Sequence, residues 1–500
     1  MALNRVFRSA TFLIAIAVLF AGQIAIRRGS ELNHDTAWFL YVAQGLLNGG
    51  ELYRDFVEVN PPLGMWLTVP VVMLSRATGL APIEALYGVF FAMTALSLLL
   101  AWRYLAMVGG VPDWVKKLVL ILLAGAFLFI PGSSFGQREH LLALLFVPWF
   151  ILRAARSQGA HVSVAESAII GVLGAVAVSL KPHAILAALA LEAMLLLRSR
   201  NLRTLFAPEN FAAVIFAALY GAALVIWSPA FLVDMVQLGI AAYVPYYGFN
   251  VTVMLERGIR PALILALSLV LLSMARGPMR ELSGFAFAVA AGFLAAYLLQ
   301  AKGYYYQLMP AQIFATISGI FALAGILVTR NAGEARKSPV VPAIAAFAIA
   351  LLSVSAQVYG YRGQPFSTAI SQYRPGAKSV FIASTNVFNG FPLAVREKLV
   401  WGSRFPALWL IPYVADRWQD GPLPEDPVIA YALDALVTDM QKFHPDVVFI
   451  SQGPDQDYIK SGTFDYLKFM NQDPRFATIW NTYEPRGQAG NFAVYVAKSP

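Results

Sequence analysis

The chain contains the stretch Asn33-His34-Asp35-Thr36-Ala37-Trp38, followed about twenty residues later by Asp55-Phe56-Val57-Glu58-Val59-Asn60-Pro61-Pro62. These residues come directly after the first hydrophobic segment, and they place one histidine and three carboxylates in the loop behind it. The rest of the chain is strongly apolar, with a mean hydropathy of +0.62 and only 13% charged residues. Two interpretations follow: a solvated loop, or a catalytic site that faces water at the edge of a bilayer.

The composition predicts a polytopic α-helical membrane protein. The sequence is 58% hydrophobic, above the roughly 45–50% of soluble domains, and many apolar runs are long enough to cross a bilayer as helices. The absence of cysteine excludes disulfides and cysteine-bound metals. The net charge of +9 falls mainly in short loops that orient membrane helices, so it predicts no nucleic-acid partner. The run 11–26 reads as a retained first helix, because no small-residue cleavage site follows it.

Loop charges predict the orientation. Arg5 and Arg8 favour a cytoplasmic N-terminus. The apolar piece 62–76 is short and contains Pro70, so we expect it to lie in the membrane interface rather than to span. All five basic loops then fall on the cytoplasmic side: Lys116-Lys117, Arg153-Arg156, Arg198-Arg200-Arg203, Arg276-Arg280 and Arg330-Arg336-Lys337.

This orientation gives about 11 transmembrane helices and an external C-terminus. The expected spans are 9–26, 84–104, 117–131, 139–155, 164–180, 183–198, 208–228, 258–275, 282–300, 306–329 and 340–357. We therefore expect a transmembrane domain over 1–357, with a long outer loop at 27–83, and a small soluble α/β domain over 358–500. In this tail, 379–383 and 447–450 read as buried strands and 424–443 as a helix.

Further polar residues gather in the other predicted outer loops. They are Arg138, Glu139 and His140 in the second, Lys181 and His183 in the third, and Lys302, Tyr304, Tyr305 and Tyr306 in the fifth. Any one of them taken alone reads equally well as an interface anchor or belt residue. Their recurrence in several loops favours one site that combines acidic and basic groups.

Such a site suits the transfer of a sugar from a lipid phosphate. Carboxylates can deprotonate a hydroxyl or ligate a divalent metal ion, with His140 and His183 as further candidate ligands. Arginine and lysine can hold a phosphate, and tyrosines can stack on a sugar. A phosphate leaving group needs cations more than a proton donor, so one carboxylate base suffices.

The first loop resembles that of GT-C membrane glycosyltransferases, closest to the protein O-mannosyltransferase and lipid A aminoarabinose transferase branch. The resemblance lies in Asp35, the aromatic stretch behind it, Gly49 to Tyr53, and the acidic residue before Pro61-Pro62. The run from Lys302 to Pro310 is similar to that branch's Lys-x-x-x-Tyr-x-Leu-x-Pro helix start. The resemblance implies a polyprenyl-phosphate-linked sugar donor, a glycan, lipid or protein acceptor, and a multi-pass plasma (inner) membrane protein whose C-terminal domain is extracytoplasmic.

Residue by residue, the resemblance makes Asp35 the candidate base, with Glu58 and Glu139 as further acidic residues of the site. Glu58 departs from the family's Glu-Lys-Pro-Pro pattern, because Val59 and Asn60 separate it from the prolines. Arg138, Lys181 and Lys302 are the candidate phosphate ligands. Candidate substrate contacts are Tyr304, Tyr305, Tyr306 and His34.

Two other functions remain open from the sequence. A lipid or sugar transporter needs polar residues near the bilayer midplane, and the predicted helix interiors hold few charges. A non-catalytic envelope assembly protein has no need for Asp35, Arg138 and Lys181 to converge. The sequence therefore favours the transferase.

Overall fold

A computed structural model describes residues 9–248, 251–331, 339–454, 456–460 and 462–498. Arg5, Arg8, Arg336 and Lys337, which enter the prediction of topology, lie outside these residues. The chain divides into two compact units. Unit 1 comprises 1–30, 83–222 and 249–359, and unit 2 comprises 31–82, 223–248 and 360–500.

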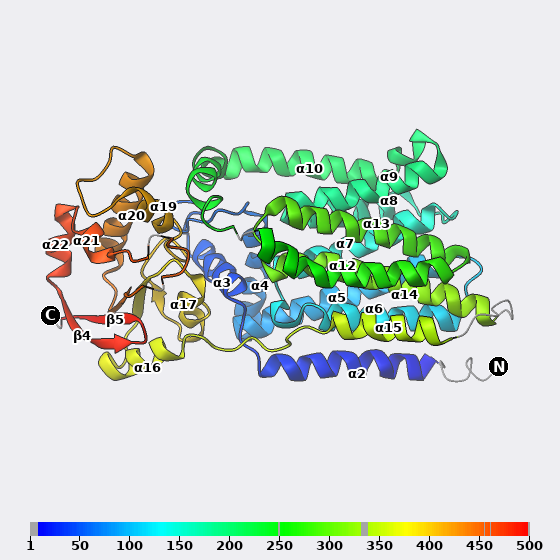
Figure 1. Ribbon diagram of the computed structural model, residues 1–500, viewed down its shortest axis with the longest axis horizontal. Helices are drawn as coiled ribbons and strands as arrows, with labels where there is room; N and C mark the ends of the chain where they lie inside the picture. Colours follow the sequence, from blue (N-terminus) through cyan, green and yellow to red (C-terminus); the bar gives the residue numbers. More distant parts are fainter. Residues whose placement is uncertain (1–8, 249–250, 332–338, 455, 461, 499–500) are drawn as a thin grey trace. The chain divides into compact units, whose positions relative to one another are not determined.

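Unit 1 is a bundle of long helices (Figure 1). Each predicted span coincides with a helix of the described chain. These helices are α2 (Ser9–Arg28), α5 (Pro82–Ala106), α6 (Asp113–Phe129), α7 (Arg138–Arg156), α8 (Val164–Leu180), α9 (Ile185–Ser199), α10 (Pro208–Trp227), α12 (Val251–Met274), α13 (Gly277–Gln300), α14 (Met309–Asn331) and α15 (Val340–Ser353). Seven stretches of the described residues are long and apolar enough to cross a membrane, which confirms a polytopic helical membrane protein.

Small residues bring the helices of unit 1 close together. A side chain at Gly292 in α13 would lie only 2.6 Å from the Ala187 Cα atom in α9. In α8, a Cβ atom at Gly174 would lie 2.8 Å from the Trp149 ring of α7. Close backbone approach through glycine and alanine is the usual way in which membrane helices pack.

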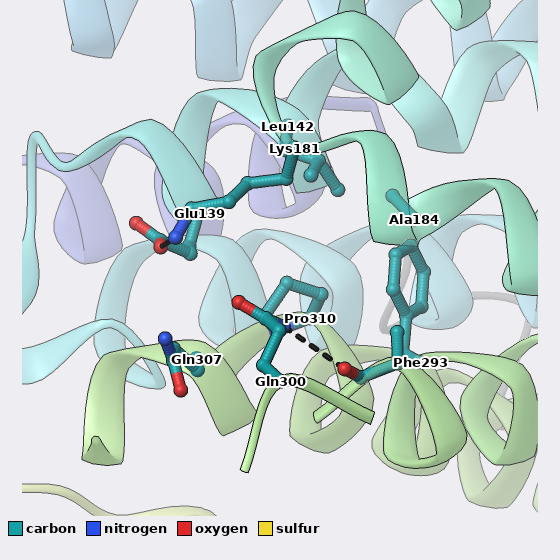
Figure 2. A pocket seen from close by; sticks show the side chains of 9 residues that line it. Glu139, Leu142, Lys181, Ala184, Phe293, Gln300, Gln307 and Pro310 are labelled. Atoms are coloured by element: carbon teal, nitrogen blue, oxygen red, sulfur yellow. Dashed lines mark hydrogen bonds and ion pairs between the residues drawn. The ribbon is translucent and has the colours of Figure 1, made fainter. Parts of the chain in front are cut away.

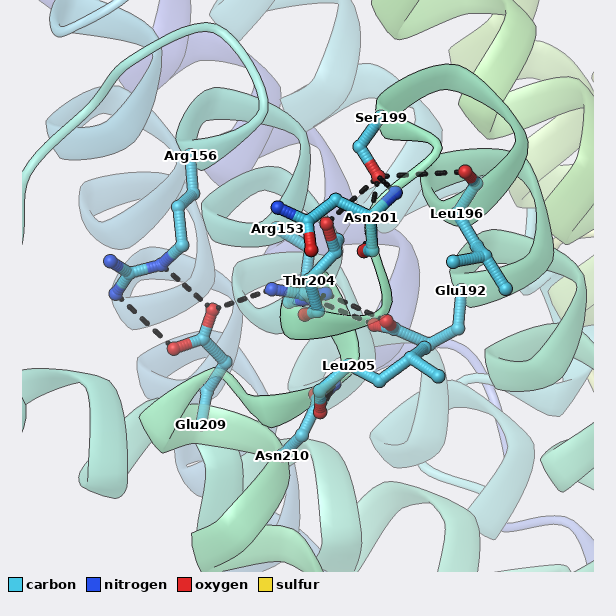
Figure 3. Close-up of polar contacts among 10 residues, drawn as sticks. All are labelled: Arg153, Arg156, Glu192, Leu196, Ser199, Asn201, Thr204, Leu205, Glu209 and Asn210. Carbon is cyan, nitrogen blue, oxygen red and sulfur yellow. Dashed lines mark hydrogen bonds and ion pairs between the residues drawn. The ribbon is translucent and has the colours of Figure 1, made fainter.

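Buried ion pairs connect several helices at one end of this bundle (Figure 3). The Arg153 guanidinium, 1% exposed, lies 2.6 Å from Glu192 and 3.1 Å from Glu209. Arg156 also pairs with Glu209, at 3.0 Å, and donates to the Ser167 hydroxyl. The two arginines and two glutamates compensate each other's charge and join α7, α8, α9 and α10. This is the end at which the predicted cytoplasmic loops lie.

Unit 2 contains a five-stranded mixed sheet in the order β2-β1-β3-β5-β4. Its strands are β1 (Ser379–Ala383), β2 (Val400–Trp401), β3 (Val447–Ser451), β4 (Tyr483–Ala489) and β5 (Phe492–Ala497). β1 pairs in parallel with β2 and β3, whereas β5 runs antiparallel to β3 and β4. The predicted strands and the helix α20 (Pro427–Phe443) are thus present, which confirms the α/β fold of the C-terminal part of the chain.

Several short helices surround the sheet in unit 2. They are α16 (Gln364–Tyr373), α17 (Val387–Gly390), α18 (Leu393–Arg396), α19 (Ile411–Arg417), α21 (Tyr466–Met470) and α22 (Pro474–Trp480). The apolar core of the unit combines residues of these helices and the strands, such as Phe381, Val448 and Phe469, with the aromatic residues Trp409 and Trp418.

The first loop belongs to the same unit as the sheet. It forms α3 (His34–Leu47) and α4 (Leu63–Thr78). Between them, the Val57 N–H donates to the Arg404 carbonyl at 2.7 Å, and Lys442 pairs with Asp55 at 2.8 Å. Tyr53 and Val57 are buried in the apolar core of the unit. The first loop is therefore held by the C-terminal part of the chain, a long-range contact with no local sequence signal.

The segment between the expected spans 208–228 and 258–275, which those spans leave as an outer loop, is largely helical in its described residues; this corrects the prediction. The π-helical turns η4 (Phe231–Met235) and η5 (Gly239–Tyr243) flank the short helix α11 (Val236–Leu238), and α12 already begins at Val251. Tyr247 packs in the core of unit 2, with its ring centroid 4.3 Å from that of Tyr458. Core packing of this segment overrides the loop-like composition.

Candidate active site

A small polar pocket lies within unit 1, at the end of the bundle where α7 begins and α13 ends (Figure 2). The lining residues are Glu139, Leu142, Lys181, Ala184, Phe293, Ala296, Gln300, Gln307 and Pro310.

An ion pair dominates the pocket. The Lys181 ammonium lies 2.9 Å from a Glu139 carboxylate oxygen, and the two side chains are only 15% and 4% exposed. Glu139 lies in the first turn of α7, and Lys181 is the residue between α8 and the 3₁₀ turn η2 (Pro182–Ala184). Figure 2 shows the two side chains pointing toward each other. Buried charges of this kind are expensive at a membrane and often mark function.

More cationic and aromatic groups surround Lys181. His183 lies within electrostatic reach of both Lys181 and Lys302. The Lys181 ammonium is 5.7 Å from the Tyr306 ring centroid, and the Tyr304 and Tyr306 rings stack at 5.5 Å. The second, third and fifth predicted loops thus contribute side chains to one place in unit 1.

Gln300 and Gln307 are pocket residues that sequence reasoning missed. Gln307 is 6% exposed, and its Oε1 atom accepts no hydrogen bond from any described residue. A buried acceptor without a donor is uncommon in native proteins. The signal available in the sequence was the position of Gln307 between Lys302 and Pro310, inside the recognised motif.

Of the candidate phosphate and substrate contacts that the structure describes, Lys181 alone is among the residues that line the pocket. Tyr305 is 68% exposed and stacks under the Arg257 guanidinium at 4.4 Å, so it does not line the pocket. Arg138 is the first residue of α7 and is half-buried, and it is likewise absent from the pocket lining.

His140 is enclosed in an aromatic box. It is fully buried, with its ring centroid 4.7 Å from Phe135 and 5.3 Å from Phe90. Its Nδ1 atom accepts the Gly136 N–H at 3.4 Å. Among the described residues, no group of three or more His, Asp or Glu side chains could hold a metal ion. Neither His140 nor His183 therefore belongs to a metal cluster within that part of the chain.

Asp35 and His34 begin helix α3 in unit 2. Asn33 is the N-cap, and its side chain accepts the Asp35 backbone N–H at 3.0 Å. The His34 Nε2 atom lies 3.4 Å from the Asp35 carboxylate, and the His34 ring packs on Phe388 at 3.8 Å. Burial lowers the pKa of His34; the nearby Asp35 opposes this shift and the Arg362 charge adds to it.

Glu58 is 6% exposed and has its hydrogen-bonding partners within the same loop. The Trp38 indole donates to one carboxylate oxygen at 2.8 Å, and the Asn60 backbone N–H donates to the other at 3.0 Å. These bonds join α3 to the turn before Pro61-Pro62. Such hydrogen bonds are typical of a side chain that stabilises the conformation of a loop.

The fold defines a polytopic helical membrane protein that also contains a unit with a mixed β-sheet. No known family model matches the chain, and no curated protein sequence matches it. Among solved structures, it is similar to ArnT from Cupriavidus metallidurans bound to undecaprenyl phosphate, with 14% identity, a TM-score of 0.53, and coverage of 99% of this chain and 100% of that one. This likeness confirms the predicted GT-C fold.

Two lower-scoring matches come from Archaeoglobus fulgidus. The apo form of its oligosaccharyltransferase has 13% identity and a TM-score of 0.45, over 96% of this chain and 73% of that one. The oligosaccharyltransferase AglB, in complex with an inhibitory peptide and a dolichol-phosphate, has 12% identity and a TM-score of 0.43, over 99% and 75% of the two chains.

Proposed function

We propose that this protein is a membrane glycosyltransferase that moves a sugar from a polyprenyl-phosphate donor to a glycan, lipid or protein acceptor. The observation that carries the proposal is the buried Glu139–Lys181 ion pair, which lines a small pocket of the helical unit. The fold shared with ArnT, whose structure holds undecaprenyl phosphate, supports the same class of donor.

In this proposal, Lys181 holds the donor phosphate. Charge-assisted bonds from an ammonium to a phosphate are stronger than neutral ones, and the 15% exposure of Lys181 limits screening by water. Glu139 keeps the ammonium directed into the pocket while no donor is bound. The stacked pair Tyr304 and Tyr306 offers an aromatic face for the sugar or the isoprenoid, and Lys302 adds positive charge.

Asp35 is the proposed base. It takes the proton of an acceptor hydroxyl, and the acceptor oxygen bonds to the anomeric carbon of the donor sugar. The bond from that carbon to the phosphate oxygen breaks, and polyprenyl phosphate leaves with the electron pair. His34 packs beside Asp35 and positions it, and Glu58 fixes the loop.

The site and unit 2 are proposed to face the extracytoplasmic side of the plasma membrane. The basis is the excess of lysine and arginine at the opposite helix ends. A reporter fused behind Pro500 that is active only outside the cytoplasm would support this orientation. Activity only in the cytoplasm would contradict it.

Lipid-linked sugars in cells that lack the protein test the function. We expect an unreacted polyprenyl-phosphate sugar to accumulate, and wild-type protein to restore the normal profile. Lys181→Met should fail to restore it. Lys117→Met, which removes a lysine paired with Asp113 outside the pocket, should succeed. An unchanged lipid profile in the deletion strain would contradict the transferase.

A further inference from the structure

A second buried cation lies in unit 1 outside the pocket lining. Arg27, in the last turn of α2, is 4% exposed. Among the described residues, no carboxylate lies within ion-pair distance of its guanidinium. Arg153, which is buried to a similar degree, pairs with two glutamates (Figure 3). The contrast indicates that the Arg27 charge is compensated by something other than these carboxylates.

The neighbours of Arg27 use only part of its donor capacity. Its Nη2 atom donates to the Gln357 carbonyl, the Tyr87 side chain lies within hydrogen-bonding reach of the guanidinium, and the Phe135 ring centroid is 5.4 Å away. The Nε and Nη1 atoms are buried, and neither has a hydrogen bond of good geometry within the described chain. Even with Tyr87 as a partner, at least one donor of this buried cation is therefore available to a ligand.

Gln23 lies one turn earlier on the same face of α2. It is 0% exposed, and both its Nε2 and Oε1 atoms lack hydrogen-bond partners among the described residues. Residues four apart on a helix are neighbours. Buried amides are nearly always paired, because an unsatisfied group keeps its full desolvation cost. The amide and the guanidinium thus present unsatisfied groups side by side.

We propose that Gln23 and Arg27 form a binding site for a phosphate group that keeps an O–H, either inorganic phosphate or a phosphomonoester. Arginine suits phosphate because its planar fork donates two parallel hydrogen bonds. The glutamine amide supplies one donor and one acceptor, and its acceptor requires an O–H on the ligand. A singly protonated phosphomonoester has such an O–H, whereas a phosphodiester or chloride has none. The ligand is either free phosphate or the headgroup of a lipid.

This site is independent of the proposed transferase activity, because Arg27 and Gln23 do not line the pocket of Lys181. Its test uses full-length protein carrying Lys181→Met, which removes the proposed donor contact. Thermal unfolding is followed in detergent at constant ionic strength. Inorganic phosphate, phosphatidic acid and the diester phosphatidylglycerol are each compared with chloride. A ligand that binds the folded state raises the midpoint with its concentration.

We expect inorganic phosphate, phosphatidic acid or both to raise the midpoint, and phosphatidylglycerol to have little effect. A response to inorganic phosphate would show that the ligand reaches the site from water. A response to phosphatidic acid alone would show that the ligand reaches the site from the bilayer. Arg27→Gln should weaken the apparent affinity by about tenfold or more. Arg28→Gln, which removes the same charge from the adjacent exposed residue, should leave the affinity unchanged.

Gln23→Leu provides a second variant that should fold well. Removing an unsatisfied buried amide should raise the unfolding midpoint without ligand, and the phosphate response should weaken. The proposal is overturned if neither inorganic phosphate nor phosphatidic acid stabilises the parent protein. It is equally overturned if Arg27→Gln and Gln23→Leu keep the full response, or if phosphatidylglycerol acts as strongly as phosphatidic acid.

Discussion

Asp35 lies in the first turn of α3, and its backbone N–H is already bound by the Asn33 side chain. The helix start therefore depends on Asn33 and not on the Asp35 carboxylate. Asp35→Asn should fold and insert normally but lose about 10²–10⁴-fold in transfer rate, the usual contribution of a general base. Turnover by purified protein, with thermal unfolding as the folding check, measures both.

Asp55→Asn is the matched control for Asp35→Asn. Asp55 lies in the same loop segment, and its carboxylate is 37% exposed and paired with Lys442. The Lys442 contact lowers the pKa of Asp55, but the pair is largely exposed and contributes little to stability. This variant should retain transfer. Equal losses in both variants would remove Asp35 from the mechanism.

Variants of Lys181 and Glu139 can distinguish a role in donor binding from a role in stability. Lys181→Met should weaken donor affinity by about ten- to a hundredfold and also destabilise the protein, because Glu139 becomes a buried carboxylate without its partner. The double variant Lys181→Met/Glu139→Gln should recover stability without recovering donor affinity. Donor titration and thermal unfolding of the three proteins test this. Normal donor affinity in the double variant would leave the pair a purely structural role.

His34 should make the stability of unit 2 depend on pH. Burial lowers its pKa in the folded state below the ordinary value of 6.5, so the unfolded state binds the proton first as the pH falls. The contribution of neutral His34 is present above that ordinary value and is lost below it. Between about pH 7 and 5, wild type should therefore lose more stability than His34→Gln. Identical losses in the two proteins would contradict the shift.

At the scale of elements, the ion-pair cluster at the end of α7 is a structural clamp. Glu209 is fully buried and pairs with both Arg153 and Arg156. Glu209→Gln should reduce stability by about 3–5 kcal/mol, because it leaves buried positive charge uncompensated. Glu51→Gln, which breaks an exposed pair with Arg54, should cost less than about 1 kcal/mol. Thermal unfolding distinguishes them, and equal effects would refute the clamp.

At the scale of elements, helices and strands could be predicted from the local sequence wherever their apolar residues form a clear pattern. Continuous apolar runs predict the helices of unit 1, and the short runs at 379–383 and 447–450 predict the central strands β1 and β3. The segment from Phe231 to Tyr243 was missed, because its helical turns depend on packing in the core of unit 2. The N-cap of α3 could not be assigned from the sequence, because Asn33 and Asp35 both suit a helix start.

For the whole molecule, the sequence predicts the class of fold better than the details of the site. The proximity of Glu139 and Lys181 could be predicted, because alternating helices return to the same membrane side; the convergence of Lys302 with them stays a prediction. The contact of the first loop with Arg404 and Lys442 could not, because it joins residues more than three hundred positions apart. The unpaired donors of Arg27 and Gln23 also become visible only in three dimensions.

The most direct test of the central claim is transfer by the purified full-length protein. The protein is mixed with polyprenyl-phosphate sugars and an extract of envelope acceptors, and the release of polyprenyl phosphate is measured. We predict release that requires both the acceptor and Lys181, and that falls at least about a hundredfold in Asp35→Asn. No release from any donor, or release that is equal in the Asp35→Asn and Lys181→Met variants and the wild type, would contradict the account.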